Sequence, residues 1–262
     1  MPETAGNEAF LFSYSPAQLL PAIFILALAS FVQGTIGFAS GLIAIPLLVL
    51  LGLPLPEAIT VNLVASAGQN CFAAWRLRRE IPYEKAWRPI ALRTVALPLG
   101  VLLLWLTGAL PQEYVKQIVG LLLLAVLIVQ WTARVEPREE LHAGWDWIAF
   151  GMGGIMLGFC GMGGPPIVLW VLAHRWTALR SRAFLFFIFA TGMLPHYLLL
   201  LFTFGGSVFP ATLLGLVSMP VVLAATSGGL YVGGRLPQAR LKLATYLALT
   251  LIAVSAIVSP WL

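Results

Sequence analysis

The sequence predicts an all-α polytopic membrane protein with two inverted-topology repeats, each formed by a glycine-tipped helical hairpin and three spanning helices. Three observations support this prediction: an apolar composition, a series of long apolar runs, and two glycine-rich interruptions at corresponding places. Of the 262 residues, 60% are hydrophobic and only 10% are charged. A soluble domain usually carries about 25% charged residues, so a water-soluble surface is excluded and the bilayer is the natural solvent.

The formal net charge of +5 also fits a membrane protein. Most basic residues lie in the short polar gaps between apolar runs, where they set membrane orientation, so no nucleic-acid partner is expected. The N-terminal residues 1–9 are acidic and lack the basic region of a cleaved signal peptide. We therefore expect the first apolar run to remain in the mature protein.

Two pairs of apolar runs are shorter than the roughly 20 residues that a spanning helix needs. They are 17–33 with 38–53 and 145–159 with 164–173, and each pair is joined by glycine. Short, interrupted segments at matching places in two halves indicate a transporter binding site. The other runs cover 57–75, 89–110, 114–133, 183–204, 208–232 and 240–259.

Basic residues predict the orientation of the runs. Gaps rich in arginine and lysine are assigned to the cytoplasm, and the nearly uncharged gaps near 111 and 205 are assigned outside. These assignments agree only if each pair of short runs forms a hairpin that enters and leaves the membrane on the same side. The first hairpin then enters from outside and the second from the cytoplasm. The basic residues concerned are Arg76, Arg78, Arg79, Lys85, Arg88, Arg175, Arg180, Arg182, Arg235, Arg240 and Lys242.

The two halves are predicted to be related by inversion. The first repeat covers 1–133, the charged linker 134–144, and the second repeat 145–262. A shift of 124 positions lays Gly34 over Gly158 and Gly37 over Gly161. Small residues therefore recur at matching places, each followed by an aliphatic helix.

The two hairpin tips have the sequences GTIGFASG (34–41) and GFCGMGGPP (158–166). Each precedes a helix start, where unpaired N–H groups and the positive end of the helix dipole favour an anion, and Ser40 is a possible N-cap. The alternative is that the glycines only permit close helix packing, as in GxxxG. The candidate substrate-binding residues at the tips are Gly34, Thr35, Gly37, Phe38, Ala39, Ser40, Gly161, Met162, Gly163 and Gly164.

Polar residues within the apolar runs complete the candidate site. The spacing of Asn62, Ser66 and Gln69 places them on one helix face, although amides also hold helices together. Arg93 lies about one helical turn inside the cytoplasmic end of the run at 89–110. Its side chain could serve the substrate, or it could extend back to the membrane interface. An ionisable group in a span is a functional candidate. The candidate substrate-binding residues within the apolar runs are Asn62, Ser66, Gln69, Arg93, Thr191 and His196.

Several chemistries find no support. The sequence contains no Walker A, HExxH or GxSxG motif, so we expect no enzyme, no cofactor and no metal site. The absence of a carboxylate in mid-span disfavours a carboxylate proton relay. Three possibilities remain for the coupling of transport: a proton on His196, a sodium site made of carbonyls, or facilitated passage without a coupling ion. Cys160 has no adjacent base and is predicted to be a packing residue rather than a nucleophile.

The tip sequences resemble those of the TauE/SafE family of sulfite exporters, also called the toluene-sulfonate uptake permease family. The similar segments are Gly34-x-x-Gly37-Phe38-Ala39-Ser40-Gly41 with Ile45-Pro46-Leu47-Leu48 and Gly52-Leu53-Pro54, and Gly158-x-x-Gly161-Met162-Gly163-Gly164-Pro165-Pro166 with Ile167-Val168. The family usually has a fuller glycine run at the first tip, where this chain has Ala39-Ser40, and often Thr-Ser in place of Val61-Asn62. The resemblance implies transport of sulfite, sulfonates or related organosulfur anions and carboxylates across the bacterial inner membrane.

The sequence therefore predicts a multi-pass secondary transporter of a small anion, with sulfite or an organosulfonate bound between two opposed hairpin tips. Two alternatives remain. An anion channel would use the same site, and a membrane subunit delivering sulfur to a partner enzyme would use a reactive Cys160. The expected partners are the anion and the lipid bilayer, with a homodimer as a further possibility.

Overall fold

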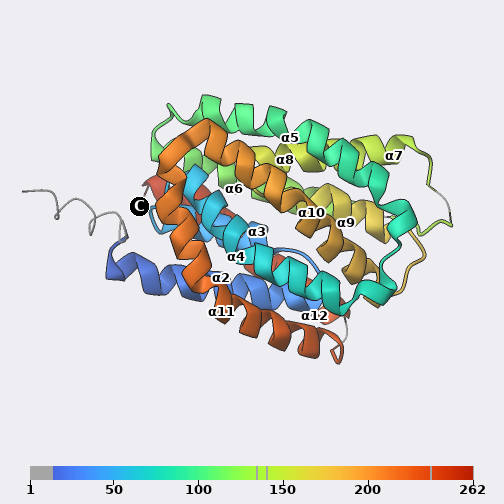
Figure 1. Ribbon diagram of the computed structural model, residues 1–262. Helices are drawn as coiled ribbons and strands as arrows, with labels where there is room; N and C mark the ends of the chain where they lie inside the picture. Colours follow the sequence, from blue (N-terminus) through green and yellow to red (C-terminus); the bar gives the residue numbers. More distant parts are fainter. Residues whose placement is uncertain (1–13, 134, 140, 237, 262) are drawn as a thin grey trace, which may run out of the picture.

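The computed structural model describes residues 14–133, 135–139, 141–236 and 238–261, which form a bundle of helices (Figure 1). The α-helices are α2 (Pro16–Ile36), α3 (Ser40–Leu50), α4 (Leu55–Arg76), α5 (Trp87–Thr107), α6 (Gln112–Thr132), α7 (Gly144–Asp146), α8 (Met152–Cys160), α9 (Gly164–Leu172), α10 (Ala178–Phe204), α11 (Phe209–Gly233) and α12 (Gln238–Val258). A π-helical turn, Trp147–Gly151, joins α7 to α8. Short 3₁₀ turns cover Arg78–Glu80, Tyr83–Lys85, Gly205–Val208 and Ser259–Trp261.

Several helices are long and apolar enough to cross a bilayer, which confirms a multi-pass membrane protein. Within the described residues these segments are Ala17–Ile36, Tyr83–Thr107, Gln112–Thr132 and Ala178–Gly233, the last of which contains α10 and α11. The predicted spanning run at 57–75 forms α4, which has 22 residues but is not among the apolar segments. It carries buried polar side chains, including Gln69 and Asn70, and packs against α10 and α11. Because α4 is enclosed by other helices, most of its surface does not face lipid and can be polar.

One length prediction is wrong. The run at 17–33 was expected to fall short of the membrane thickness, but α2 has 21 residues and is therefore about 31 Å long. The helix continues through Gln33 and Gly34 and ends only at Gly37, whose φ of 92° lies in the left-handed region. Of the other three segments, 38–53 and 164–173 form the short helices α3, with 11 residues, and α9, with nine. The run at 145–159 forms α7, the π-helical turn Trp147–Gly151 and the nine-residue α8, which follow one another without a break.

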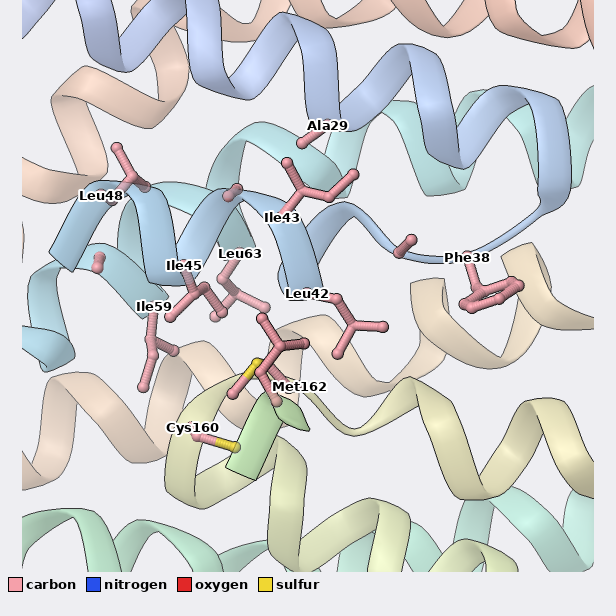
Figure 2. Packing of buried hydrophobic residues seen from close by; sticks show 14 of the residues in the cluster. Ala29, Phe38, Leu42, Ile43, Ile45, Leu48, Ile59, Leu63, Cys160 and Met162 are labelled. Carbon is pink, nitrogen blue, oxygen red and sulfur yellow. The ribbon is translucent and has the colours of Figure 1, made fainter. Parts of the chain in front are cut away.

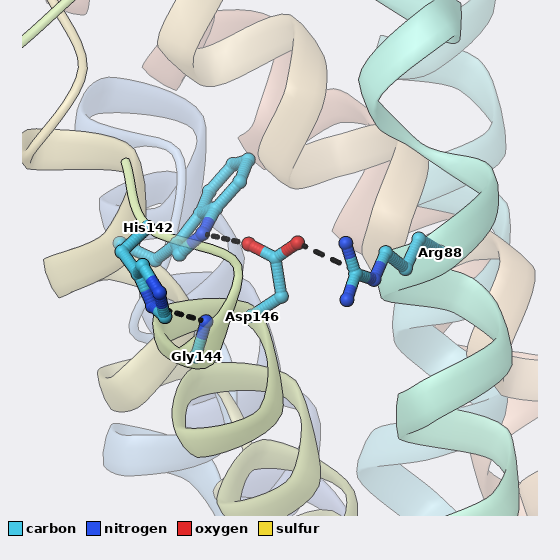
Figure 3. Close-up of polar contacts among 5 residues, drawn as sticks. Arg88, His142, Gly144 and Asp146 are labelled. Carbon is cyan, nitrogen blue, oxygen red and sulfur yellow. Dashed lines mark hydrogen bonds and ion pairs between the residues drawn. The ribbon is translucent and has the colours of Figure 1, made fainter. Parts of the chain in front are cut away.

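The two ends of the second hairpin, α7–α9, lie together (Figure 3). Asp146 in α7 accepts a hydrogen bond of 2.8 Å from Trp170 Nε1 in α9, and it forms an ion pair of 3.7 Å with Arg88 in α5. At the base of the first hairpin, α2–α3, Tyr14 precedes α2 and donates a 2.6 Å hydrogen bond to Glu57 at the start of α4. Since α4 then runs for 22 residues toward the α5 start, the two hairpin bases lie at opposite ends of the bundle.

Close helix packing accounts for some of the conspicuous glycines. A Cβ added at Gly34 would lie 2.7 Å from the Thr226 carbonyl oxygen of α11, and one at Gly158 would lie 2.7 Å from the Val101 nitrogen of α5. The packing alternative therefore holds for Gly34 and Gly158. Gly37 and Gly161 serve a different purpose, because both have positive φ and each ends a helix.

Apolar side chains fill the contact between the two tips (Figure 2). Leu42 and Ile45 of α3 lie against the loop that contains Met162, next to Ile59 of α4. The Cys160 thiol is buried and donates to the Met156 carbonyl oxygen at 3.2 Å. Cys160 therefore packs within the protein.

Both described ends of the chain lie at one end of the bundle (Figure 1), and the C-terminal turn Ser259–Trp261 packs against α6. The basic connections, which include Arg78 and Arg180, lie at the opposite end. Because basic loops remain in the cytoplasm, reporters fused to the two termini are expected to be located outside the cytoplasm. If a reporter that functions only in the cytoplasm is active at both termini, this orientation is wrong.

Candidate functional site

A cavity with a volume of about 70 Å³ lies between the two hairpin tips and helices α4, α5 and α10. Because one water molecule needs about 10–15 Å³ on this measure, the cavity has room for a small ion or a few waters. Its lining residues are Gln33, Ala39, Ser40, Gly41, Leu42, Ile59, Asn62, Leu63, Ser66, Asn70, Arg93, Leu157, Gly161, Met162, Gly163, Gly164, Phe189, Gly192, Met193 and His196.

The structure brings together part of the site predicted from sequence. The candidates that line the cavity are Ala39, Ser40, Asn62, Ser66, Arg93, Gly161, Met162, Gly163, Gly164 and His196. The candidates that do not line it are Gly34, Thr35, Gly37, Phe38, Gln69 and Thr191. Of the second group, Gly34 packs against α11, and the Thr35 and Thr191 hydroxyls each donate to a backbone carbonyl oxygen three residues earlier.

The polar face of α4 differs from the predicted one by one residue. Asn62, Ser66 and Asn70, which are four residues apart, line the cavity. Gln69 instead accepts a 2.8 Å hydrogen bond from Thr226 in α11. Both amides fit a helical spacing from Ser66, so only the position of α11 distinguishes the cavity-facing residue from the packing residue.

A buried hydrogen-bond chain connects the first tip with α4. The Ser40 backbone N–H donates to Gln33 Oε1 at 3.1 Å, and Gln33 Nε2 donates to Asn70 Oδ1 at 2.7 Å. The Ser40 hydroxyl donates to Asn62 Oδ1 at 2.9 Å. Ser40 is therefore not the predicted N-cap, since Ala39 holds that position. The Asn62 oxygen accepts this hydrogen bond, so the N–H donors of the Asn62 amide remain available to the cavity.

Arg93 supplies the positive charge of the cavity. The residue is only 4% exposed, and its Nη1 donates to the Ile188 carbonyl oxygen of α10 at 2.5 Å. No carboxylate pairs with Arg93 within the described part of the chain. The interpretation that Arg93 extends back to the membrane interface is therefore wrong.

A glycine on α10 makes room for this guanidinium. A Cβ added at Gly192 would lie 2.8 Å from Arg93 Nη1. Gly192→Ala is therefore expected to displace the guanidinium and weaken binding of the anion proposed below by about fivefold, a loss comparable to that of one hydrogen bond. Gly228→Ala, which meets only a phenylalanine ring at 3.6 Å, is the matched control. Calorimetric titration of both variants measures the effect, and unchanged affinity in Gly192→Ala would contradict the assigned position of Arg93.

His196 completes the polar lining on α10. It is fully buried, and neither ring nitrogen has a hydrogen-bond partner among the described residues. Thr191, the other candidate on this helix, donates to the Ile188 carbonyl oxygen at 2.9 Å and does not reach the cavity.

The second tip is shaped by contact with the first. A Cβ added at Gly41 would lie 2.8 Å from the Gly161 carbonyl oxygen, so the two backbones meet directly. The following helix α9 begins with Gly164, and Pro165 and Pro166 come next. Proline has no N–H, so the start of α9 offers fewer donors than that of α3.

The backbone of Ala39 is unusual. Its φ of 92° lies in the left-handed region, which non-glycine residues adopt at a cost of about 1–2 kcal/mol. Ala39→Gly is therefore expected to stabilise the protein by about 1 kcal/mol, measured as a rise in Tm. A lower Tm for this variant would show that the alanine methyl group contributes more through packing than it costs in strain.

The geometry defines a multi-pass membrane protein with a small cavity between its helices, lined by polar side chains and the buried Arg93. Residues 22–256 match the family model described as Sulfite exporter TauE/SafE, and the chain belongs to this family. It is therefore a membrane transporter and not an enzyme. Comparisons with curated proteins and with solved structures found no match.

Proposed function

We propose that this transporter carries a small oxyanion, sulfite or an organosulfonate, by binding it in the cavity between the two hairpin tips. The observation that carries the proposal is the buried Arg93 guanidinium, which has no carboxylate partner among the described residues. A buried charge without a counter-charge is unfavourable. A bound anion would supply the missing charge.

The arrangement of donors supports an oxyanion in particular. Arg93 approaches from α5, the Asn62 amide from α4, and the backbone of Gly164 from the start of α9. An oxyanion has several oxygens that accept hydrogen bonds from different directions. Charge-assisted hydrogen bonds from a guanidinium are among the strongest available in proteins.

We also propose that residues 1–133 and 145–262 act as two inverted repeats joined by a linker at 134–144. When the starts of α4, α5 and α6 are moved by 124 residues, they fall within two residues of the starts of α10, α11 and α12. The same shift relates Gly37 to Gly161, two glycines that end helices with positive φ. Movement of one repeat against the other would open the site alternately to each side of the bacterial inner membrane.

Transport in proteoliposomes tests this function. Vesicles preloaded with unlabelled sulfite are expected to accumulate labelled sulfite transiently by counterflow, and uptake is expected to saturate. Flux that neither saturates nor shows counterflow would instead support an anion channel. If neither sulfite nor an organosulfonate is transported, the proposed substrate class is wrong.

Replacement of Ser40 is expected to have a smaller, measurable effect on the affinity for sulfite. Ser40→Ala removes the hydroxyl that orients Asn62, so we expect affinity for sulfite to fall by about fivefold, corresponding to about 1 kcal/mol. Ser227→Ala is the matched control, because its hydroxyl bonds only to the Leu223 carbonyl of its own helix. Equal affinities in the two variants would remove Ser40 and Asn62 from the site.

A further inference from the structure

His196 has an environment that a purely structural histidine seldom has. A buried polar group normally has a hydrogen-bond partner, yet both ring nitrogens of His196 lack one among the described residues. The residue lines the cavity rather than a helix interface alone. An unpaired buried ring at the wall of a cavity is suited to bind something that enters the cavity.

The charged groups that share the cavity with His196 follow from its described lining. The lining residues of the cavity include one charged group, Arg93. Arg93 also lies close to the ring, because its guanidinium contacts Gly192, which lies one helical turn before His196 on α10. The polar residues of α4 that line the cavity are Asn62, Ser66 and Asn70, and α9 contributes only Gly164, so neither helix adds a carboxylate to the lining. A second positive charge next to Arg93 is therefore unfavourable when no anion is bound.

A divalent anion reverses this balance. Arg93 compensates one of its two negative charges, and the second would remain unpaired in a buried cavity, which is costly. A proton on His196 would supply the missing positive charge and would turn an idle ring nitrogen into a hydrogen-bond donor toward the anion. The empty site thus disfavours this proton and the occupied site requires it.

We propose that His196 is a proton-binding site that is filled together with the anion, so that the protein carries a divalent oxyanion and one proton as a unit. The proton comes from solvent and forms an N–H bond on the ring, and it leaves when the anion leaves. The inference rests on the proposed anion site, and it adds a second, obligatory cargo that the anion site alone does not require.

Nitrogen NMR of histidine-labelled protein tests the proposal directly. The chain has three histidines, and His196→Gln identifies the His196 signals by their loss. His142 is exposed and His174 lies between Trp170 and Trp176 at the cytoplasmic end of the second hairpin, so these two serve as internal references. Burial lowers the pKa of His174, and its ring should stay neutral above neutral pH.

The spectra are recorded above neutral pH, where sulfite is mainly a dianion, with and without saturating sulfite. We expect the His196 signals to change from a neutral imidazole to an imidazolium on addition of sulfite, while those of His142 and His174 stay unchanged. Calorimetry on the same sample measures binding independently. Bound sulfite with a neutral His196 would overturn the proton site and leave the anion site intact, whereas absence of binding would overturn both.

The His196→Gln variant provides a second test by calorimetry. Titrations in two buffers of different ionisation enthalpy give the number of protons taken up with each sulfite. We expect this number to fall by about one in His196→Gln relative to the wild-type protein, with weaker binding, because glutamine cannot take up a proton. An unchanged number of protons in a folded variant would contradict the proposal.

Discussion

Arg93→Gln is expected to weaken sulfite binding by about 10- to 150-fold. Hydrogen bonds to a charged group contribute about 1.5–3 kcal/mol, and 1.4 kcal/mol corresponds to a factor of ten in affinity. The variant is expected to stay folded with a similar Tm, because it removes a buried charge that has no carboxylate partner in the described structure. Affinity is measured by calorimetry on the purified, monodisperse protein.

Arg88→Gln is the matched control for Arg93→Gln. Both arginines belong to α5, but Arg88 forms an ion pair of 3.7 Å with Asp146 at the end of the bundle and does not line the cavity. Its replacement should leave the affinity for sulfite unchanged. Wild-type affinity in Arg93→Gln would show that the guanidinium serves the fold alone.

Gly161→Val is expected to abolish measurable sulfite binding. At φ of 68° a β-branched residue is strained, and the added side chain would collide with Ile45 and approach Ile59 to 3.3 Å. The tip would then have to move away from the first hairpin, and the cavity between them would change shape. Affinity and thermal stability are both measured on the folded fraction.

Gly37→Val separates an effect on the site from an effect on the fold. Gly37 has a similar backbone, with φ of 92°, but its added Cβ would meet Arg182 at 3.0 Å, outside the cavity. From sequence alone the two valine variants are equivalent. The structure predicts that both lose stability and that Gly161→Val loses far more affinity. Folded Gly161→Val with wild-type affinity would place the site elsewhere.

Much of the fold could be predicted from the sequence. Apolar runs and their basic gaps predicted a multi-pass helical protein, and the glycine-rich interruption at the second tip predicted where α8 ends. The length of α2 was missed because Gln33 and Gly34 suggest the end of an apolar run. In the structure Gln33 bonds to Asn70 and Gly34 packs on α11, so neither residue faces lipid.

The candidate site was less predictable, because its members are selected by neighbouring helices. Asn70 and Gln69 are adjacent amides, and only the position of α11 decides which of them lines the cavity. Gly192 carries no signal of its own, and its role appears only when Arg93 lies against it. The spacing of Asn70, four residues after Ser66, already indicates a place near the polar face of this helix.

The location of a bound oxyanion is the most direct test of the proposed site. Selenite, a pyramidal oxyanion like sulfite, contains an atom that scatters X-rays anomalously and can be located in crystals of the protein. We expect one anomalous peak inside the cavity, within hydrogen-bond distance of the Arg93 guanidinium and the Asn62 amide, and no peak there in Arg93→Gln crystals. A peak elsewhere in the membrane-spanning region, with the cavity empty, would contradict the assignment of the site to the two hairpin tips.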